Sequence, residues 1–235
     1  MSKLAFIFPG QGAQFVGMGK DFYDNHAAAR KYFEEADEAL GYSISRMCFE
    51  GSEDELKLTA NTQPAILVVS VIVNEILKSE GITAQIAGGH SLGEYAAMAV
   101  SGMISTEDAF RLIKARSEAM DEAARENKGA MAAVMKIDPS VVEEVCNNAK
   151  DYSAAVNFNS PQQTVIAGTP EGIAEVSAVF ANMKAKVIPL NVAGAFHSKL
   201  MQSAADKFYE TAKNTEFHTP QIKYYSNVTG GELTD

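Results

Sequence analysis

A serine between two glycines is the residue most clearly arranged for chemistry. The segment Gly89-His90-Ser91-Leu92-Gly93 matches the pattern G-x-S-x-G and lies between a short apolar segment and a helix-like run. In a sharp strand-to-helix turn, this pattern exposes the serine hydroxyl and points the next backbone N–H, that of Leu92, to where an oxyanion would form. The N-terminus of the helix adds a field that favours developing negative charge. The pattern therefore predicts a nucleophilic Ser91, and the alternative is a glycine-rich turn with an incidental serine.

A nucleophilic serine needs a base, and the chain has four histidines. The one in the most suitable place is His197, in a small-residue loop (Gly-Ala-Phe-His-Ser, 194–198) after an expected strand and before an expected helix. Loops at the ends of sheets are where catalytic residues collect. The other three lie inside the serine turn, in a polar helix-like region and in a loop-like stretch: His90, His26 and His218. We therefore favour His197 as the base over a purely structural loop histidine.

A second glycine-rich segment covers residues 10–19. It fails as a nucleotide site, because Met18 stands where the Walker A pattern needs lysine and Phe15 occupies the third glycine position of G-x-G-x-x-G. Two interpretations stay open for its first residues, Gly10-Gln11-Gly12. Either a backbone N–H of this loop completes an oxyanion hole beside the serine, or the glycines simply form a turn.

Arg116 is the most informative charged residue. On an expected helix its neighbours three and four positions away are all apolar, so it projects from the buried face. Those neighbours are Leu112, Ile113, Ala119 and Met120. A buried guanidinium without a partner costs several kcal/mol. Arg116 therefore has an internal partner or binds an anionic ligand through two parallel hydrogen bonds. A nucleophilic serine upstream on the same sheet favours a ligand carboxylate.

The order of elements can position these residues. We expect strands at residues 3–8 and 86–88 and helices at 21–40, 65–77, 92–100 and 107–125, with Asn61-Thr62-Gln63-Pro64 as a helix start. Alternating strands and helices predict an α/β fold with a parallel sheet. A further helix near residues 199–213 and a strand near 222–226 continue this domain.

The middle of the chain has a different pattern. Expected strands at 130–137, 154–158, 164–167 and 185–190, with helices at 139–149 and 171–183, give the order β-α-β-β-α-β. This is the order of a ferredoxin-like unit. We therefore predict a small domain at 128–192, inserted into a large domain formed by 1–127 and 193–235.

Composition narrows the class of protein. The 235 residues are 46% hydrophobic and 21% charged, which is ordinary for a globular chain. A net charge of −10 without a basic tract argues against nucleic-acid binding. The two cysteines, Cys48 and Cys146, indicate neither a zinc site nor a disulfide framework. The apolar start is too short for a signal peptide, and the richest apolar run, 65–73, is about half the ~20 residues that a membrane helix needs. We expect a cytoplasmic protein that does not bind membranes.

Together these motifs resemble the malonyl-CoA:acyl-carrier-protein transacylase family, which includes the acyltransferase domains of polyketide and fatty acid synthases. The match covers essentially the whole chain in order. It runs through Phe-Pro-Gly-Gln-Gly at 8–12, Asn-Thr-Gln-Pro-Ala at 61–65, Gly-His-Ser-Leu-Gly-Glu-Tyr at 89–95, Arg116, Asn-Ser-Pro at 159–161, Gly-Ala-Phe-His-Ser at 194–198 and Ser-Asn-Val-Thr-Gly at 226–230.

The resemblance implies an α/β-hydrolase-like large domain with a ferredoxin-like insert, and an acyltransferase that moves a malonyl group from malonyl-CoA to an acyl carrier protein in fatty acid biosynthesis. Ser91 would carry the acyl group, His197 would be the base, and the N–H groups of Gln11 and Leu92 would form the oxyanion hole. Arg116 would bind the malonyl carboxylate. The remaining substrate-binding residues would be Gln63, Met120 and Phe196, and Phe196 resembles the malonyl-selecting form of its loop. No cofactor is implied, since malonyl-CoA is a substrate.

The family runs some tens of residues beyond the Ser-Asn-Val-Thr-Gly strand, and there it places a glutamine whose backbone carbonyl orients the histidine. Three alternatives remain beside the fatty acid enzyme. They are a stand-alone acyltransferase of a polyketide synthase, a serine thioesterase or esterase, and a non-catalytic module that binds a carrier protein or CoA. Arg116 on an apolar face and the inserted domain favour transfer of a carboxylated acyl group over simple hydrolysis.

Overall fold

The computed structural model describes residues 3–233, which form two compact units. The large unit comprises the chain up to Glu118 together with the part from Phe208 onward, and the small unit is Ala119–Lys207. The mixed α/β architecture predicted from the sequence is confirmed. The domain boundaries at 127/128 and 192/193 stay predictions.

The large unit contains a mostly parallel sheet. Its strands are β1 (Ala5–Phe8), β2 (Ile86–Gly89), β7 (Lys223–Tyr225) and β8 (Glu232–Leu233), in the order β1-β2-β7-β8. The first three strands are parallel and β8 is antiparallel to β7. Phe8 pairs with Gly89, so β1 and β2 end at the same edge of the sheet. Residues that follow these two strands therefore meet at the edge where α/β folds place their sites.

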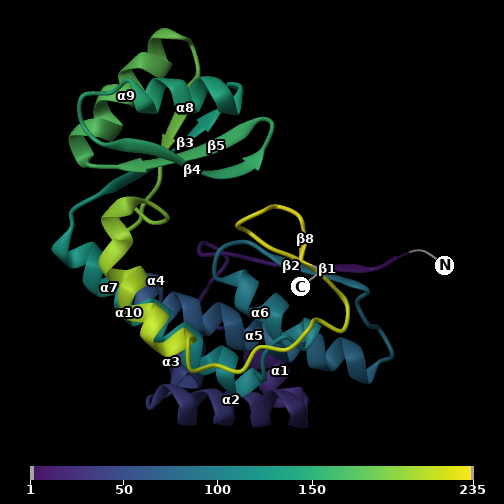
Figure 1. Cartoon of the computed structure of the whole chain (residues 1–235). Coiled ribbons are helices and arrows are strands. Elements are labelled where there is room, and N and C mark those ends of the chain that lie inside the picture. Colours follow the sequence, from purple (N-terminus) through teal and green to yellow (C-terminus); the bar gives the residue numbers. More distant parts are fainter. Residues whose placement is uncertain (1–2, 234–235) are drawn as a thin grey trace. The chain divides into compact units, whose positions relative to one another are not determined.

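Helices cover one face of this sheet (Figure 1). α6 (Gly93–Ser101) packs on all three parallel strands, and α5 (Thr59–Ser79) packs on α6 and on α2 (Ala27–Leu40). This unit also contains α1 (Lys20–Asn25), α3 (Ile44–Glu50) and α4 (Glu53–Lys57). Two further helices, α7 (Thr106–Glu126) and α10 (Gln202–Ala212), each have residues in both units. The core of this unit includes Phe33, Leu67, Ala87 and Phe110, which are all fully buried. α6 is thereby held directly behind the edge where β2 ends.

The single helix predicted at 21–40 is wrong, because His26 interrupts it. His26 has an extended backbone (φ −126°, ψ 123°) between α1 and α2. The Arg30 side chain binds two carbonyl groups near the end of α1, donating to the Tyr23 oxygen at 2.8 Å and to the Asp24 oxygen at 3.2 Å. This side chain satisfies carbonyl groups that a continuing helix would have used, so the helix ends there.

The predicted start of the next long helix is also wrong. α5 begins at Thr59, so Pro64 lies inside the helix. Proline has no N–H for the carbonyl four residues earlier, which is that of Ala60. The Tyr42 hydroxyl donates to this carbonyl at 3.2 Å and replaces the lost bond. A tertiary contact thus allows proline where local preference predicts a helix boundary.

The same helix corrects the expectation that the apolar run is too short to span a membrane. α5 has 21 residues and is the one helix in the described part of the chain that is long and apolar enough to do so. Its buried residues, such as Ile66, Leu67 and Ile72, belong to the core of the large unit. This helix is a core helix of that unit.

The small unit has an antiparallel sheet with two helices on one face (Figure 1). The strands are β3 (Ala130–Met135), β4 (Ser153–Ser160), β5 (Gln163–Gly168) and β6 (Lys186–Pro189), in the order β4-β5-β3-β6. The helices are α8 (Pro139–Asn147) and α9 (Pro170–Asn182). This arrangement confirms the predicted β-α-β-β-α-β unit. Alternate residues of β3 serve two cores: Val134 packs with α8 and α9, and Ala133 packs on the opposite face.

Candidate active site

Ser91 lies in a sharp turn between β2 and α6. Its backbone is left-handed (φ 52°), a conformation that is uncommon outside glycine. Both glycines of the pattern are sterically required. A Cβ on Gly89 would lie 2.1 Å from the carbonyl of Gly93, and a Cβ on Gly93 would lie 2.3 Å from the carbonyl oxygen of Phe8. The pattern G-x-S-x-G is therefore the signature of a tight strand-to-helix turn that brings α6 against β1.

Two backbone N–H groups lie on the segments around this turn. Leu92 is buried and directly precedes α6, whose N-terminus favours negative charge. Gln11 follows β1, and its segment packs against the turn: the His90 N–H donates to the Phe8 oxygen at 2.9 Å, and a Cβ on Gly10 would lie 2.5 Å from His90 Nδ1. Within residues 3–233, neither the Leu92 nor the Gln11 N–H has a hydrogen-bond acceptor. Both groups are thus available to a ligand oxygen.

Arg116 on α7 reaches the serine directly. Its guanidinium donates to Ser91 Oγ at 3.1 Å and to the side-chain oxygen of Gln63 on α5. The guanidinium carbon also lies 5.7 Å from the centre of the Tyr95 ring. Because a guanidinium only donates, Ser91 Oγ accepts here and keeps its own proton for another acceptor. The structure thus brings together Ser91, Arg116 and Gln63, which the sequence analysis assigned to one site.

The surroundings of Arg116 are poor in negative charge. Its apolar helical neighbours, such as Leu112 and Ile113, are buried, as the sequence pattern predicts. Burial lowers the pKa of the guanidinium, while Tyr95 and Glu94 act in the opposite direction. In the part of the chain that the structure describes, no carboxylate lies within 4 Å of the Arg116 nitrogens. The arrangement favours an external anion as the missing partner.

His197 lies in a tight loop of the small unit. Its backbone is left-handed (φ 63°) and its side chain is exposed. The loop is closed by the Phe196 N–H, which donates to the Gly194 oxygen at 3.0 Å, and by the Ser198 hydroxyl, which donates to the Ala195 oxygen at 2.6 Å. These contacts fix the backbone on both sides of the imidazole and present it at the tip of a turn.

The other two predicted substrate-binding residues are buried in the small unit. Phe196 is 5% exposed and Met120 is 9% exposed, and both belong to the apolar cluster on the sheet face opposite α8 and α9. Their contribution to a substrate pocket stays a prediction.

Four residues that the sequence analysis did not single out also belong to this site. Tyr95 packs on Arg116, and the side chains of Glu94, Tyr224 and Asn227 form hydrogen bonds around the serine turn. Glu94, Tyr95 and Asn227 lie within motifs that support the family resemblance. The roles of Glu94, Tyr224 and Asn227 could not be found by spacing, because their contacts join residues 130 to 138 positions apart.

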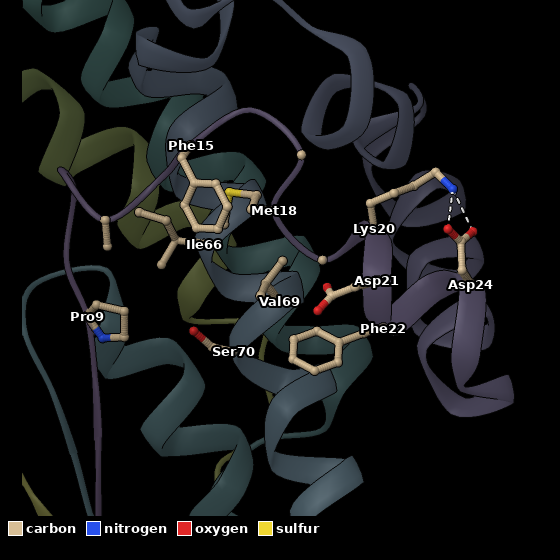
Figure 2. Close-up of a pocket in the computed structure, with 13 residues that line it drawn as sticks. Pro9, Phe15, Met18, Lys20, Asp21, Phe22, Asp24, Ile66, Val69 and Ser70 are labelled. Atoms are coloured by element: carbon tan, nitrogen blue, oxygen red, sulfur yellow. Dashed lines mark hydrogen bonds and ion pairs between the residues drawn. The ribbon is translucent and has the colours of Figure 1, made fainter.

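A cavity of about 740 Å³ lies elsewhere in the large unit (Figure 2). Its lining is mostly apolar and includes Pro9, Phe15, Met18, Ile66 and Val69. The ion pair of Lys20 and Asp24 is at its side, and neither Ser91 nor Arg116 lines it. Among residues 3–233, no group of three His, Cys, Asp or Glu side chains could hold a metal ion. The candidate active site is therefore the serine turn, with Ser91 and Arg116, and not this mostly apolar cavity.

Comparison with known proteins agrees with this geometry. The chain belongs to the acyl transferase domain family, whose sequence model matches residues 5–234. It is similar to the malonyl CoA-acyl carrier protein transacylase of Bacillus subtilis (strain 168), with 42% identity over 239 residues that cover all of this chain and 75% of the relative.

Solved structures give the same result. The acyl-carrier-protein S-malonyltransferase of Burkholderia pseudomallei 1710b superposes with a TM-score of 0.93 at 38% identity, over 100% of this chain and 77% of that one. A malonyl-transacylase in complex with its type II PKS acyl-carrier protein superposes with a TM-score of 0.93 at 35% identity, with the same coverage. The chain thus spans about three quarters of the length of these relatives.

Proposed function

We propose that this protein transfers a malonyl group from malonyl-CoA to the phosphopantetheine thiol of an acyl carrier protein, in fatty acid biosynthesis. The observation that carries the proposal is the contact of the Arg116 guanidinium with Ser91 Oγ at 3.1 Å. A cation beside a nucleophilic hydroxyl suits an acyl group with a free carboxylate near its reacting carbonyl. A simple esterase has no need for it.

The reaction proceeds through two exchanges at Ser91. Ser91 Oγ attacks the thioester carbonyl and His197 takes the hydroxyl proton. The carbon–sulfur bond then breaks as His197 gives this proton to the departing sulfur, which leaves as the CoA thiol. The carrier thiol then attacks the malonyl-serine ester and His197 takes the thiol proton. That proton returns to Ser91 Oγ as the ester bond breaks. The N–H groups of Gln11 and Leu92 stabilise the oxyanion in both steps.

The substrate is oriented by its carboxylate. Arg116 forms two parallel hydrogen bonds with it, and the amide of Gln63 holds the guanidinium in place. Phe196 and Met120 supply apolar surface that suits an unbranched malonyl group. The chemistry needs no cofactor, because the thioester is already activated. The site of action is the cytoplasm, where malonyl-CoA and the carrier protein are available.

A polyketide pathway is the second candidate, because one similar structure is a malonyl-transacylase bound to a type II PKS acyl-carrier protein. The chemistry at Ser91 is the same in both pathways. Transfer rates to a fatty acid carrier and to a polyketide carrier, measured side by side, distinguish them.

The test is labelling of the purified chain by radioactive malonyl-CoA. We expect a stable label on Ser91 that moves to added carrier protein. Ser91→Ala abolishes the label, whereas Ser79→Ala, at an exposed serine at the end of α5, keeps it. Rapid release of free malonate without acceptor would identify a hydrolase instead. Binding of the carrier without any label would identify a non-catalytic module.

A further inference from the structure

The serine turn leaves two backbone groups that α6 cannot satisfy. The carbonyl of Gly89 and the N–H of Ser91 lie on either side of His90, at the point where β2 has ended and the helix has not begun. A single side chain binds both: Asn227 accepts from the Ser91 N–H through Oδ1 at 3.0 Å and donates to the Gly89 oxygen through Nδ2. The amide of Asn227 therefore bridges the turn in the way that a neighbouring strand would.

Asn227 is itself held in place by two residues. Its backbone N–H donates to Oε1 of Glu94 at 2.9 Å, and the hydroxyl of Tyr224 donates to the same oxygen at 2.7 Å. Glu94 lies in the first turn of α6, and Tyr224 is a buried residue of β7. Burial and the hydrogen bond to Glu94 raise the pKa of Tyr224, so its hydroxyl stays a donor. Tyr224 and Asn227, at and just after the end of β7, are thus hydrogen-bonded to residues before and after the serine. Asn227 binds Gly89 before it, and both residues bind Glu94 after it.

The backbone of Ser91 requires such support. A left-handed non-glycine residue persists only where the surrounding structure holds it. The same backbone sets the direction of the Leu92 N–H, the next group along the chain. If the turn relaxed, the hydroxyl and this N–H would both change direction relative to a bound carbonyl.

We propose that Asn227, held by Glu94 and Tyr224, is a positioning residue that fixes the nucleophile turn for acyl transfer. The proposal rests on the function proposed above. Only a side chain that donates and accepts at once can make this bridge, and of the shape-matched alternatives aspartate lacks the donor. Because the bridge acts on the reacting hydroxyl and the oxyanion site, it should affect every acyl group equally. Arg116, in contrast, acts on the carboxylate.

The test compares Asn227→Asp and Asn227→Ala with Val228→Ala, a control in the same turn whose native side chain is 92% exposed. We expect kcat for malonyl transfer to fall about 10²-fold in both Asn227 variants, the loss typical of a small misplacement of reacting groups. KM for malonyl-CoA should change little and the malonyl-to-acetyl ratio should stay constant, and Val228→Ala should match the native protein. A kcat within twofold of the native value, or a loss confined to KM, would overturn the proposal.

Two further measurements keep the test decisive. Tyr224→Phe keeps the buried ring and removes one hydrogen bond to Glu94, so we expect a smaller fall in kcat than in the Asn227 variants. Glu94→Gln keeps the acceptor oxygen and should therefore retain more activity than Glu94→Ala.

The rate at which a fluorophosphonate labels Ser91 reports on the geometry of the serine turn without any acyl donor. If the native protein reacts with this probe but transfers no malonyl group, the proposed function fails. If the Asn227 variants react with it as fast as the native protein, the positioning role fails.

Discussion

The guanidinium of Arg116 donates to Gln63 and Ser91, and neither acceptor carries a charge. Arg111, on the same helix, forms an ion pair with Asp108 at 2.7 Å. The two arginines therefore differ in whether a carboxylate of the protein balances their charge. Arg111 is neutralised inside the fold, whereas Arg116, which donates to the Ser91 hydroxyl, forms no ion pair with a carboxylate among residues 3–233.

We expect Arg116→Ala to lower kcat/KM for malonyl transfer about 10²–10³-fold. Breaking one member of a partly buried charge pair costs about 3–5 kcal/mol, and about 1.4 kcal/mol corresponds to a factor of ten. Acetyl transfer should be unchanged or faster, because an acetyl group has no carboxylate to pair. Arg116→Lys should restore only part of the loss, since an ammonium cannot form the two parallel bonds.

The decisive quantity is the ratio of malonyl to acetyl kcat/KM in the Ala variant, with Arg111→Ala as the control. An equal fall for both acyl groups would show that Arg116 is structural and contradict the carboxylate role.

The two cysteines give a prediction about pH. Both are buried free thiols, and burial raises the pKa of Cys48 to about 12. The ordinary thiol pKa is about 8.5, so above that pH the unfolded chain loses this proton while the folded chain keeps it. The unfolded state then binds fewer protons, and the free energy of unfolding falls as pH rises from about 9 toward 12.

Urea unfolding at a series of alkaline pH values measures this slope. Burial likewise raises the pKa of Tyr42 to about 12, so this residue adds to the fall above about pH 10. Cys48→Ala should reduce the slope in the lower part of the range, and an unchanged slope would contradict the assignment. Iodoacetamide at pH 8 should leave Cys48 unmodified until the protein unfolds, because the thiolate is the reactive form.

At the scale of elements, the sequence predicts an element well where the local pattern alone fixes it. The serine turn follows from two glycines at positions where a Cβ atom would collide with backbone. The small unit follows from short apolar runs in the order β-α-β-β-α-β, with Pro139 and Pro170 at the helix starts. The predicted helix boundaries are wrong where contacts with side chains from other segments determine where a helix begins or ends. His26 ends a helix because Arg30 binds carbonyl groups of the preceding turn, and the start of α5 depends on a tyrosine from another segment.

The short helix α4 was missed although its signal is local. Ser52 and Glu55 form a capping box: the hydroxyl of Ser52 accepts from the Glu55 N–H, and the carboxylate of Glu55 accepts from the Ser52 N–H at 2.9 Å. This S-x-x-E spacing predicts a helix start. The positioning role of Asn227, in contrast, has no local signal, because its partners are the backbone of residues 136 and 138 positions earlier.

Tyr42 gives the prediction that belongs to this scale. Tyr42→Phe removes the hydroxyl that binds the Ala60 carbonyl above Pro64 and leaves a part-buried acceptor without a partner. We expect the free energy of unfolding to fall by about 1 kcal/mol, the usual effect of one hydrogen bond. Urea unfolding measures it, and Tyr209→Phe, at a residue 64% exposed, is the matched control. Equal stability of the two variants would show that the hydroxyl does not support α5.

At the scale of the whole molecule, the proposed function requires this acidic protein to bind an acyl carrier protein, and carrier proteins of this kind are acidic as well. The net charge of −10 opposes such an encounter unless a local basic surface exists. Residues 184–223 contain six lysines and three acidic residues. Three of these lysines are neutralised within the fold: Lys207 pairs with Glu122, Lys213 with Glu210 and Lys223 with Glu232.

The other three, Lys184, Lys186 and Lys199, are exposed, and within residues 3–233 no carboxylate lies within 4 Å of their ammonium groups. All three lie in the small unit, and the Lys199 ammonium is over the Tyr152 ring, 3.9 Å from its centre. We therefore expect a triple change of these lysines to glutamate to raise KM for the carrier protein and leave KM for malonyl-CoA unchanged. The effect should shrink as salt is added, because the attraction between exposed charges is screened.

The matched control reverses Lys31, Lys57 and Lys78, which lie on helices of the large unit and carry the same total charge. It separates a local docking surface from a general effect of net charge. If both triple variants raise KM for the carrier equally, the net charge of the molecule governs the encounter and no local surface is needed. If the small-unit variant also raises KM for malonyl-CoA, those lysines act on the phosphopantetheine arm that malonyl-CoA and the carrier have in common rather than on the surface of the carrier protein. A rise confined to the carrier and to the small-unit variant is the result that the distribution of paired and unpaired lysines predicts.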